Sequence, residues 1–276
     1  MKEGRLSSRP GEAIRLKLTR IIAIALALAV VSAACHSKPR QYRPVVDPEL
    51  LKLTKDQLFQ KGEELYGKRR WQRARTYYQH VYENYPNDPL GRRALLRIAD
   101  TYYEQSDPIN LVEAQYKYRD FINRYPGSDR ADYALLQIAM VSFKQMERPD
   151  RDQQKTREAV EKFNDMIRAY PRSTLRSEAE ARLQDANDRL AKHEHIVAKY
   201  YMKRHSFDSA VRRLNFLVDT YPNYRDKDAV FYDLGEALDQ LGRKGEARLY
   251  FERVVSEYPK SDFAGRARKR LDQIKA

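Results

Sequence analysis

The stretch Ala247-Arg-Leu-Tyr-Phe251-Glu-Arg-Val254-Val-Ser-Glu-Tyr258-Pro259 decides the fold of this chain. Ala247, Phe251 and Val254 are spaced by four and then three residues, so they share one face of an α-helix. Pro259 has no amide hydrogen and keeps the residue before it out of the helical region, so we expect the helix to end there. The stretch therefore predicts an amphipathic helix with a defined end.

The same pattern occurs five times along the chain. Tyr-Pro pairs end at Pro86, Pro126, Pro171, Pro222 and Pro259. Twelve residues before each proline stands an alanine: Ala74, Ala114, Ala159, Ala210 and Ala247. A large apolar residue stands eight positions before each proline: Tyr78, Tyr118, Phe163, Leu214 and Phe251. Another stands five positions before: Val81, Phe121, Met166, Leu217 and Val254. Self-similarity of this kind is typical of a repeat protein.

A second helix is expected before each of these helices, and it carries a small residue. These residues are Gly62, Ala99, Ala139, Ala198 and Gly235. In three repeats the small residue precedes the alanine by twelve positions, as expected for two antiparallel helices that approach closely at both points. This spacing is that of the tetratricopeptide repeat, a helix-turn-helix unit of about 34 residues. In the second and third repeats the separations are fifteen and twenty, which predicts longer loops there.

We therefore predict an all-α fold, a tetratricopeptide-repeat solenoid of five helix pairs plus a C-terminal helix. The first helices of successive repeats should line its concave surface. Residues 55–173 should hold repeats one to three, and residues 174–276 repeats four and five with a C-terminal capping helix. Residues 174 to about 204 contain no Gly or Pro and carry apolar residues at helical spacing. They should form one connecting helix about 45 Å long.

Residues 1–34 have the features of a secretory signal peptide. Six basic residues within positions 1–20 precede the apolar run Ile21–Val31, and small residues precede Cys35. The apolar run is too short to cross about 30 Å of hydrocarbon as a helix. Cys35 resembles the lipidated cysteine of bacterial lipoproteins, although Ser32 stands where that family usually has Leu. The alternative is an ordinary signal peptide with an incidental cysteine.

Residues 35–54 should form the lipidated cysteine and an extended tether, because Pro39, Pro44 and Pro48 disfavour a helix. Multiple acyl chains on Cys35 would hold the protein on a membrane. Residue 36 is His and not the Asp that retains many lipoproteins on the inner membrane. The resemblance therefore implies a lipid-anchored protein on the periplasmic face of the outer membrane.

Motifs for catalysis, metal binding and nucleotide binding are absent from the sequence. There is no G-x-x-x-x-G-K, H-E-x-x-H or G-x-S-x-G pattern, so we predict no enzyme, assign no catalytic residue and expect no cofactor. His193 and His195 are two positions apart on a predicted helix and point in different directions, so we expect no shared metal. The net charge of +14 is spread along the predicted helices and does not form a Lys/Arg block. Export would also remove the protein from its usual nucleic-acid ligand, so a nucleic-acid partner is disfavoured.

The repeat register places aromatic and charged residues on the inner groove. They are Phe59, Glu63 and Tyr66 of repeat one, and Arg93, Arg97, Asp100 and Tyr103 of repeat two. Arginines interleaved with aromatic residues suit an extended peptide, whose backbone and terminal carboxylate guanidinium groups can bind. The alternative is that these tyrosines only pack between neighbouring helices.

The full arrangement resembles the BamD family, lipoproteins of the outer-membrane β-barrel assembly machinery. The resemblance runs from Cys35 to about Ala264 and is carried by the five Tyr-Pro units, by Asp150-Arg151-Asp152 and by the run from Leu190 to Arg204. It implies an adaptor that binds the targeting segments of unfolded outer-membrane proteins. It also implies docking on the POTRA domains of a BamA-type barrel, alongside other lipoproteins of the machinery.

On this resemblance, Tyr66, Arg93, Arg97 and Tyr103 are the expected substrate-recognition residues and Arg204 the expected docking residue. Membrane contact would be made through the lipid anchor. An alternative function is that of a periplasmic tetratricopeptide adaptor of the Tol-Pal envelope system, which has similar Tyr-Pro repeats. The tether that leads directly into repeat one disfavours this alternative.

Overall fold

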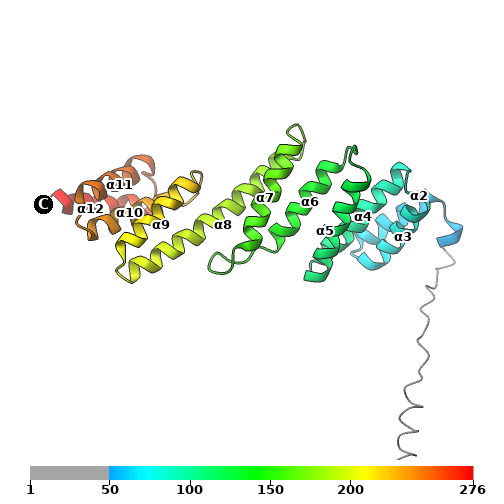
Figure 1. Cartoon of the computed structure of the whole chain (residues 1–276), viewed down its shortest axis with the longest axis horizontal. Helices are drawn as coiled ribbons and strands as arrows, with labels where there is room; N and C mark the ends of the chain where they lie inside the picture. The colour runs from blue at the N-terminus through cyan, green and yellow to red at the C-terminus, as the bar shows by residue number, and fades with distance from the viewer. Residues whose placement is uncertain (1–49, 276) are drawn as a thin grey trace, which may run out of the picture. The chain divides into compact units, whose positions relative to one another are not determined.

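A computed structural model describes residues 50–275, which belong to the unit Glu49–Ala276. Cys35, the signal peptide and most of the predicted tether lie outside the described residues. The 3-10 helix η1 spans Leu50–Lys52 and is followed by eleven α-helices in this part of the chain (Figure 1). They are α2 Lys55–Gly67, α3 Trp71–Asn84, α4 Pro89–Gln105, α5 Pro108–Arg124, α6 Ala131–Lys144, α7 Gln154–Ala169, α8 Arg176–Lys203, α9 Phe207–Thr220, α10 Lys227–Gln240, α11 Lys244–Glu257 and α12 Asp262–Lys275.

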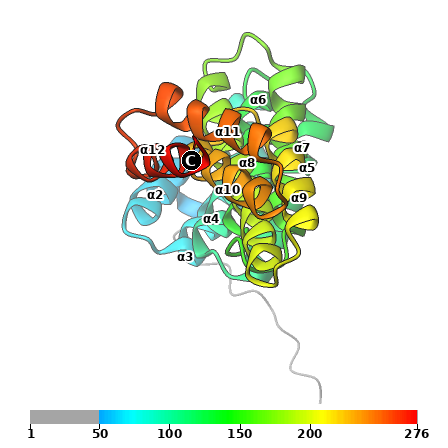
Figure 2. The same ribbon diagram turned by 90° about the vertical axis from the view of Figure 1, so that its left-hand side faces the viewer.

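The helices pack mainly against their neighbours in chain order, as expected for a repeat protein. The five pairs are α2 with α3, α4 with α5, α6 with α7, the C-terminal half of α8 with α9, and α10 with α11. Figure 2 shows α12 beside α10 and α11, against which it packs. The all-α tetratricopeptide-repeat solenoid of five helix pairs plus a C-terminal helix is therefore confirmed.

Each Tyr-Pro pair ends the second helix of its repeat. The tyrosine is the C-cap residue in all five cases: Tyr85, Tyr125, Tyr170, Tyr221 and Tyr258. Its backbone N–H donates to the carbonyl four residues earlier, at 2.9 to 3.1 Å. Its own carbonyl accepts from the residue three positions later, which closes a β-turn with proline in the second position. The predicted helix ends are confirmed.

The predicted small residues mark close contacts between paired helices. Gly62 lies against Tyr78, and a Cβ at this glycine would be 2.5 Å from Cε1 of the ring. Gly235 lies in the same way against Phe251, and its Cβ would be 2.6 Å from Cε1. Both rings are fully buried. Glycine is favoured at these two positions because a Cβ would force the facing ring to shift.

The second repeat differs from the prediction of a longer loop. Only Ser106 and Asp107 separate α4 from α5, and the extra residues lengthen both helices to 17 residues. Ser106 adopts a left-handed conformation that stops α4, and Asp107 caps the backbone N–H of Asn110, with Pro108 in the first turn of α5. In the third repeat the loop is long, at residues 145–153, as expected from the sequence.

The last residues of the predicted tether are not extended. Residues up to Thr54 were expected to be extended, but Leu50–Lys52 form η1 and Leu50 is 4% exposed. Leu50 belongs to the same apolar cluster as Leu58 and Phe59 of α2. Thr54 then begins α2 as the N-cap of a capping box with Gln57. The first repeat therefore begins before residue 55, because Leu50 contributes to its core.

Helix α8 belongs to two packing units. Its N-terminal part places Ala179 in a cluster with Phe163 and Met166 of α7. Its C-terminal part places Ala191 and Ala198 in the cluster built by α9 to α12. A helix of 28 residues is about 42 Å long, so it reaches from repeat three to repeat four. Within residues 50–275, no helix combines the length and hydropathy needed to span a bilayer.

Candidate functional site

A pocket of about 820 Å³ lies between α4, α6 and the turn that joins α5 to α6. Its charged and polar lining consists of Arg92, Arg93, Arg97, Asp100, Ser128, Asp129, Arg130 and Tyr133. Pro89 supplies exposed apolar surface, whereas Leu96 and Phe121 are buried beneath the lining. Four arginines and two aspartates give the lining a formal net charge of +2. The pocket therefore suits a ligand that carries an anionic group.

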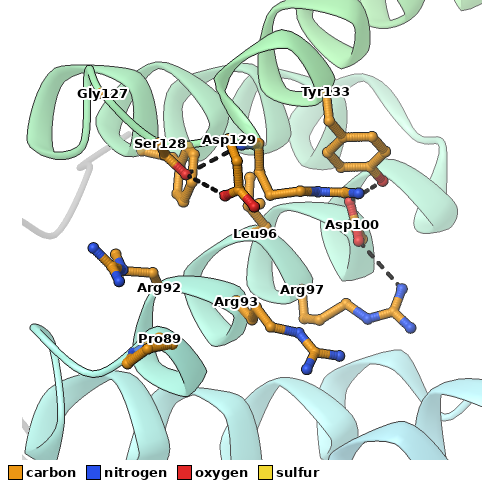
Figure 3. Close-up of a pocket in the computed structure, with 12 residues that line it drawn as sticks. Pro89, Arg92, Arg93, Leu96, Arg97, Asp100, Gly127, Ser128, Asp129 and Tyr133 are labelled. Atoms are coloured by element: carbon orange, nitrogen blue, oxygen red, sulfur yellow. Dashed lines mark hydrogen bonds and ion pairs between the residues drawn. The ribbon is translucent and has the colours of Figure 1, made fainter. Parts of the chain in front are cut away.

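Helix α4 sets the direction of the arginines. Asp88 caps its N-terminus by accepting a hydrogen bond from the Leu90 N–H, and Pro89 occupies the first turn. Arg93 and Arg97 are four residues apart and therefore share a face of the helix. Figure 3 shows these two side chains extending in the same direction from α4, with Arg92 extending the opposite way.

Arg97 forms a bidentate pair with Glu63 of α2. Its Nε donates to Oε1 at 2.7 Å, and its Nη2 donates to Oε2. The Tyr78 hydroxyl of α3 donates to Glu63 Oε1 at 2.7 Å, and the Tyr66 ring lies 4.5 Å from the Arg97 guanidinium carbon. Partial burial opposes ionisation of Glu63, but the contacts with Arg97 and Tyr78 outweigh it and lower the pKa of this carboxyl. Arg97 is therefore fixed between two helices as a charged group.

Asp100 is a buried carboxylate at the bottom of the pocket. It accepts hydrogen bonds from the Tyr118 hydroxyl at 2.6 Å, the Tyr133 hydroxyl at 2.8 Å and Arg97 Nη1 at 3.3 Å. Figure 3 shows its contacts with Arg97 and Tyr133. Burial raises the pKa of Asp100 above its ordinary value, although these donors favour the ionised form. The hydrogen bonds join α4, α5 and α6 through one residue.

The predicted groove residues do not all lie in this pocket. Arg93 and Arg97 line it, and the guanidinium carbon of Arg93 is 4.9 Å from the centroid of Phe59. Phe59 is 5% exposed and packs against Tyr78. Tyr66 lies edge-on to Trp71 at 4.7 Å, and Lys144 Nζ lies 4.0 Å from the Tyr103 ring. Tyr66 and Tyr103 are outside the pocket lining.

Several pocket residues escaped the sequence prediction. Arg92 precedes the predicted Arg93, and Arg130 and Tyr133 follow the second Tyr-Pro turn. The Tyr125 hydroxyl donates to the Pro86 carbonyl at 2.7 Å, so the Tyr-Pro turns of repeats one and two are in contact. A sequence signal was available in the polar run Gly127-Ser-Asp-Arg130 after the second turn. The sequence does not show that this run lies next to α4, because that position depends on how the repeats stack.

The C-terminal half contains Arg204, the expected docking residue, and the two histidines of α8. Arg204 is exposed at the C-cap of α8, with its guanidinium carbon 5.6 Å from the Tyr200 ring centroid. His193 Nδ1 lies 2.7 Å from the Pro149 carbonyl oxygen, and the buried His195 has Nε2 2.7 Å from Asp233 Oδ2. In the described part of the chain, no three His, Cys, Asp or Glu side chains are grouped as metal ligands.

Two relatives of this chain, from different bacteria, carry the same name. A protein of Caulobacter vibrioides called outer membrane protein assembly factor BamD is 25% identical over 228 residues, covering 82% of this chain and 72% of the relative. One of the same name from Rickettsia prowazekii is 25% identical over 252 residues, covering 89% of this chain and 94% of the relative. One solved structure, the TPR2AB-domain:pHSP90 complex of yeast Sti1, matches with a TM-score of 0.44 and 15% identity, covering 80% of this chain and 83% of that chain.

The family model that matches this chain covers most of its length. Residues 52–250 match the model of the YfiO family, which is described as outer membrane lipoprotein. This range contains the pocket, helix α8 and most of the five helix pairs. The chain therefore belongs to the YfiO family of outer membrane lipoproteins, which is the BamD family that its Tyr-Pro repeats indicated.

Proposed function

We propose that this protein is an assembly factor for outer-membrane β-barrel proteins and that it acts by binding and not by catalysis. Family membership and the relatives called outer membrane protein assembly factor BamD support this role. The repeat fold fits it, because stacked helix pairs provide a long ordered surface for extended ligands.

The N-terminal repeats bind targeting segments of unfolded outer-membrane proteins. The observation that carries this step is the 820 Å³ pocket between repeats two and three, which four arginines line. Arg93 and Arg97 lie in its wall, while Phe59, Tyr66 and Tyr103 are not part of its lining. An extended segment presents charged groups along one line, which matches this lining.

The C-terminal repeats dock on the POTRA domains of a BamA-type barrel, and other lipoproteins of the machinery join the same assembly. Arg204 supports this proposal because its guanidinium is exposed beside Tyr200, which is itself 55% exposed. Arginine and tyrosine are the residue types enriched at protein interfaces. Acylation of Cys35 holds the protein on the periplasmic face of the outer membrane.

Affinity purification of the tagged full-length chain from detergent-solubilised envelopes tests this function. A large barrel protein with POTRA domains should co-purify in stoichiometric amount, and Arg204→Glu should reduce its recovery. Lys199→Glu is a suitable control, because Lys199 is also an exposed cation of α8. Recovery of Tol-Pal components, with no barrel protein, would contradict the proposal and favour the alternative envelope adaptor.

Peptide titration tests the recognition step separately. Arg93→Glu should weaken binding of a barrel-protein C-terminal peptide about tenfold or more, because a repelling charge replaces an attracting one. Arg97→Glu should weaken it too, but this change also breaks the pair with Glu63. Arg119→Glu on α5 makes the same charge reversal outside the pocket and should leave affinity unchanged. Equal affinities for all four proteins would remove the pocket from the proposed function.

A further inference from the structure

Helix α5 carries apolar side chains on two opposite faces. One face is buried in the core and holds Leu111, Ala114, Tyr118 and Phe121. The other face holds Ile109, Val112 and Tyr116, which are 78%, 62% and 60% exposed. Their spacing of three and four residues places these three side chains in one row along the helix, here called the α5 stripe. Single exposed apolar residues are common on proteins, but a contiguous exposed row marks a surface that contacts something else.

Polar side chains border the α5 stripe on the helices at either side. These exposed residues are Gln72, Arg73 and Thr76 on α3, and Arg157, Glu161 and Asn164 on α7. The apolar surface is therefore only one helix wide. The centre of a protein–protein interface is usually a broader apolar patch, whereas shallow insertion into a bilayer surface needs one apolar helix face.

Unpaired cations lie beside the α5 stripe. Lys117 Nζ is 5.3 Å from the centroid of the Tyr116 ring, and Arg119 is exposed. Neither of these cations forms an ion pair within residues 50–275. The carboxylates of α5, Glu113 and Asp120, are each attracted by an arginine already. Anionic headgroups attract such unpaired cations, and tyrosine is enriched where a membrane meets water, so the surroundings of the stripe suit a lipid surface.

The chain before Leu50 limits how far the N-terminal repeats can lie from an acylated Cys35. These two residues are 15 positions apart, so even a fully extended chain spans only about 50 Å between them. Leu50 packs in the cluster that contains Ala94 and Ile98 of α4, and α4 is the partner of α5 in repeat two. A membrane that holds the anchor is therefore within reach of α5.

From this arrangement we propose that the α5 stripe inserts shallowly into the bilayer surface that holds the lipid anchor. Ile109 and Val112 enter the boundary between headgroups and acyl chains, and Tyr116 lies at the level of the headgroups. Lys117 and Arg119 bind the phosphate groups of anionic lipids. The contact orients the N-terminal repeats on the membrane, which a single point of attachment does not do. It rests on the proposed function in one respect, the acylation of Cys35, which brings the bilayer within reach.

Quenching of tryptophan fluorescence by brominated acyl chains tests this contact, because it requires proximity to the hydrocarbon. The acylated full-length chain is reconstituted in vesicles of phosphatidylethanolamine and phosphatidylglycerol, with and without bromine on the acyl chains. I109W places a tryptophan in the stripe, and L249W places one at a position of α11 that is 61% exposed. The unaltered protein, with Trp71 alone, gives the background. At an insertion depth of about 5–10 Å, the added fluorescence of I109W should fall about twofold, and that of L249W should not change.

Two combined variants identify the side chains responsible. I109W/V112S/Y116S makes the rest of the stripe polar and should lose most of the quenching, because too little apolar surface remains for insertion. I109W/F216S is the matched control, since Phe216 is an exposed apolar residue of α9, and it should keep the quenching of I109W. Circular dichroism of each variant shows whether its helix content equals that of the unaltered protein.

The outcomes separate the membrane contact from the lipid anchor. Quenching of I109W that is absent in L249W, lost in I109W/V112S/Y116S and kept in I109W/F216S supports the contact. If the protein floats with the vesicles and I109W is not quenched, the contact is overturned and the anchor stands. Equal quenching of I109W and L249W, or quenching that survives in I109W/V112S/Y116S, also overturns it.

Photo-crosslinking from position 109 in whole envelopes tests the competing occupant, a protein. A protein adduct, together with unquenched I109W in vesicles, would assign the α5 stripe to a protein partner and overturn the membrane contact. If the unaltered chain does not float with the vesicles, both the acylation and the contact fail. The role in barrel assembly is judged separately, by co-purification of the barrel protein.

Discussion

Arg97 of α4 and Glu63 of α2 are joined by a bidentate hydrogen-bonded ion pair across the first two repeats. The two residues are 34 positions apart in the sequence and occupy the first helices of adjacent repeats. About a third of each side chain is exposed, so the pair lies at the edge of the core and beside the pocket. The contribution of this pair to the free energy of unfolding should therefore be measurable both by varying the pH and by substitution.

Glu63→Gln should lower the free energy of unfolding by about 1–2 kcal/mol at pH 7, since a charged hydrogen bond is weakened at a partly exposed site. The pKa of Glu63 is lowered in the folded protein. Its stabilising effect is therefore fully present above the ordinary value of 4.5 and is lost as the pH falls through the folded-state pKa. The difference between the two proteins should shrink below pH 4.5.

The measurement is urea unfolding at pH values from about 3 to about 7, which is roughly the range of this titration. Unfolding is followed by the fluorescence of Trp71. This is the only tryptophan of the chain and lies against Tyr66 in the same repeat. Glu83→Gln is the matched control, because Glu83 is an exposed carboxylate of α3 in the same repeat and forms no ion pair within residues 50–275. If both variants had the same pH dependence, the Glu63–Arg97 pair would not contribute as proposed.

Tyr118→Phe should lower the free energy of unfolding by about 1–3 kcal/mol, because the buried Asp100 loses its shortest hydrogen bond. Tyr118 is fully buried, so water cannot replace the missing hydroxyl without a new cavity. Thermal or chemical unfolding followed by circular dichroism provides the measurement. Tyr116→Phe removes a hydroxyl from an exposed side chain of the same helix and should change stability by less than about 0.5 kcal/mol. Equal effects of the two changes would contradict a structural role for the Asp100 hydrogen bonds.

Gly235→Ala should destabilise the protein by about 1–3 kcal/mol through overpacking against the Phe251 ring, despite the better helix propensity of alanine. Phe251→Leu in the same chain should recover part of this loss. In repeat four, the positions that correspond to Gly235 and Phe251 hold Ala198 and Leu214, and both of these residues are fully buried. Unfolding midpoints of the single and double variants give the coupling energy.

Gly265→Ala on α12 is the control for this series. A Cβ at Gly265 would meet no atom within 4 Å, so the change should stabilise the helix by about 0.5–1 kcal/mol. Destabilisation by Gly235→Ala that Phe251→Leu fails to relieve would point to a cause other than contact with the ring.

Asn187→Pro should separate the unfolding of the two halves of the chain. Proline inside a helix costs about 3 kcal/mol or more, and position 187 lies between the segments of α8 that pack on α7 and on α9. Circular dichroism should then show two transitions, with Trp71 fluorescence following only the one that includes repeat one. Asn187→Ala should keep a single transition, because alanine favours the helix. Two transitions already present in Asn187→Ala would show that α8 does not couple the halves.

The sequence by itself determined the repeat architecture. Helix periodicity and the chemistry of proline act locally, so the five Tyr-Pro pairs located the ends of five helices, each with tyrosine at the C-cap. The small residues Gly62 and Gly235 likewise indicated close helix contacts, because a side chain would occupy the space of a facing ring. The register also placed Arg93 and Arg97 on one face of α4.

Only the tertiary structure decided which of these arginines has a partner. Glu63 reaches Arg97, and Arg130 enters the pocket from the α5–α6 turn, because the repeats stack with a particular rotation that the spacing of residues does not encode. The short loop of the second repeat has a similar origin: Ser106 and Asp107 end and restart the helices, and the added residues continue the packing of α4 and α5. Pairings between residues far apart in the chain depend on geometry that forms only when the repeats pack together.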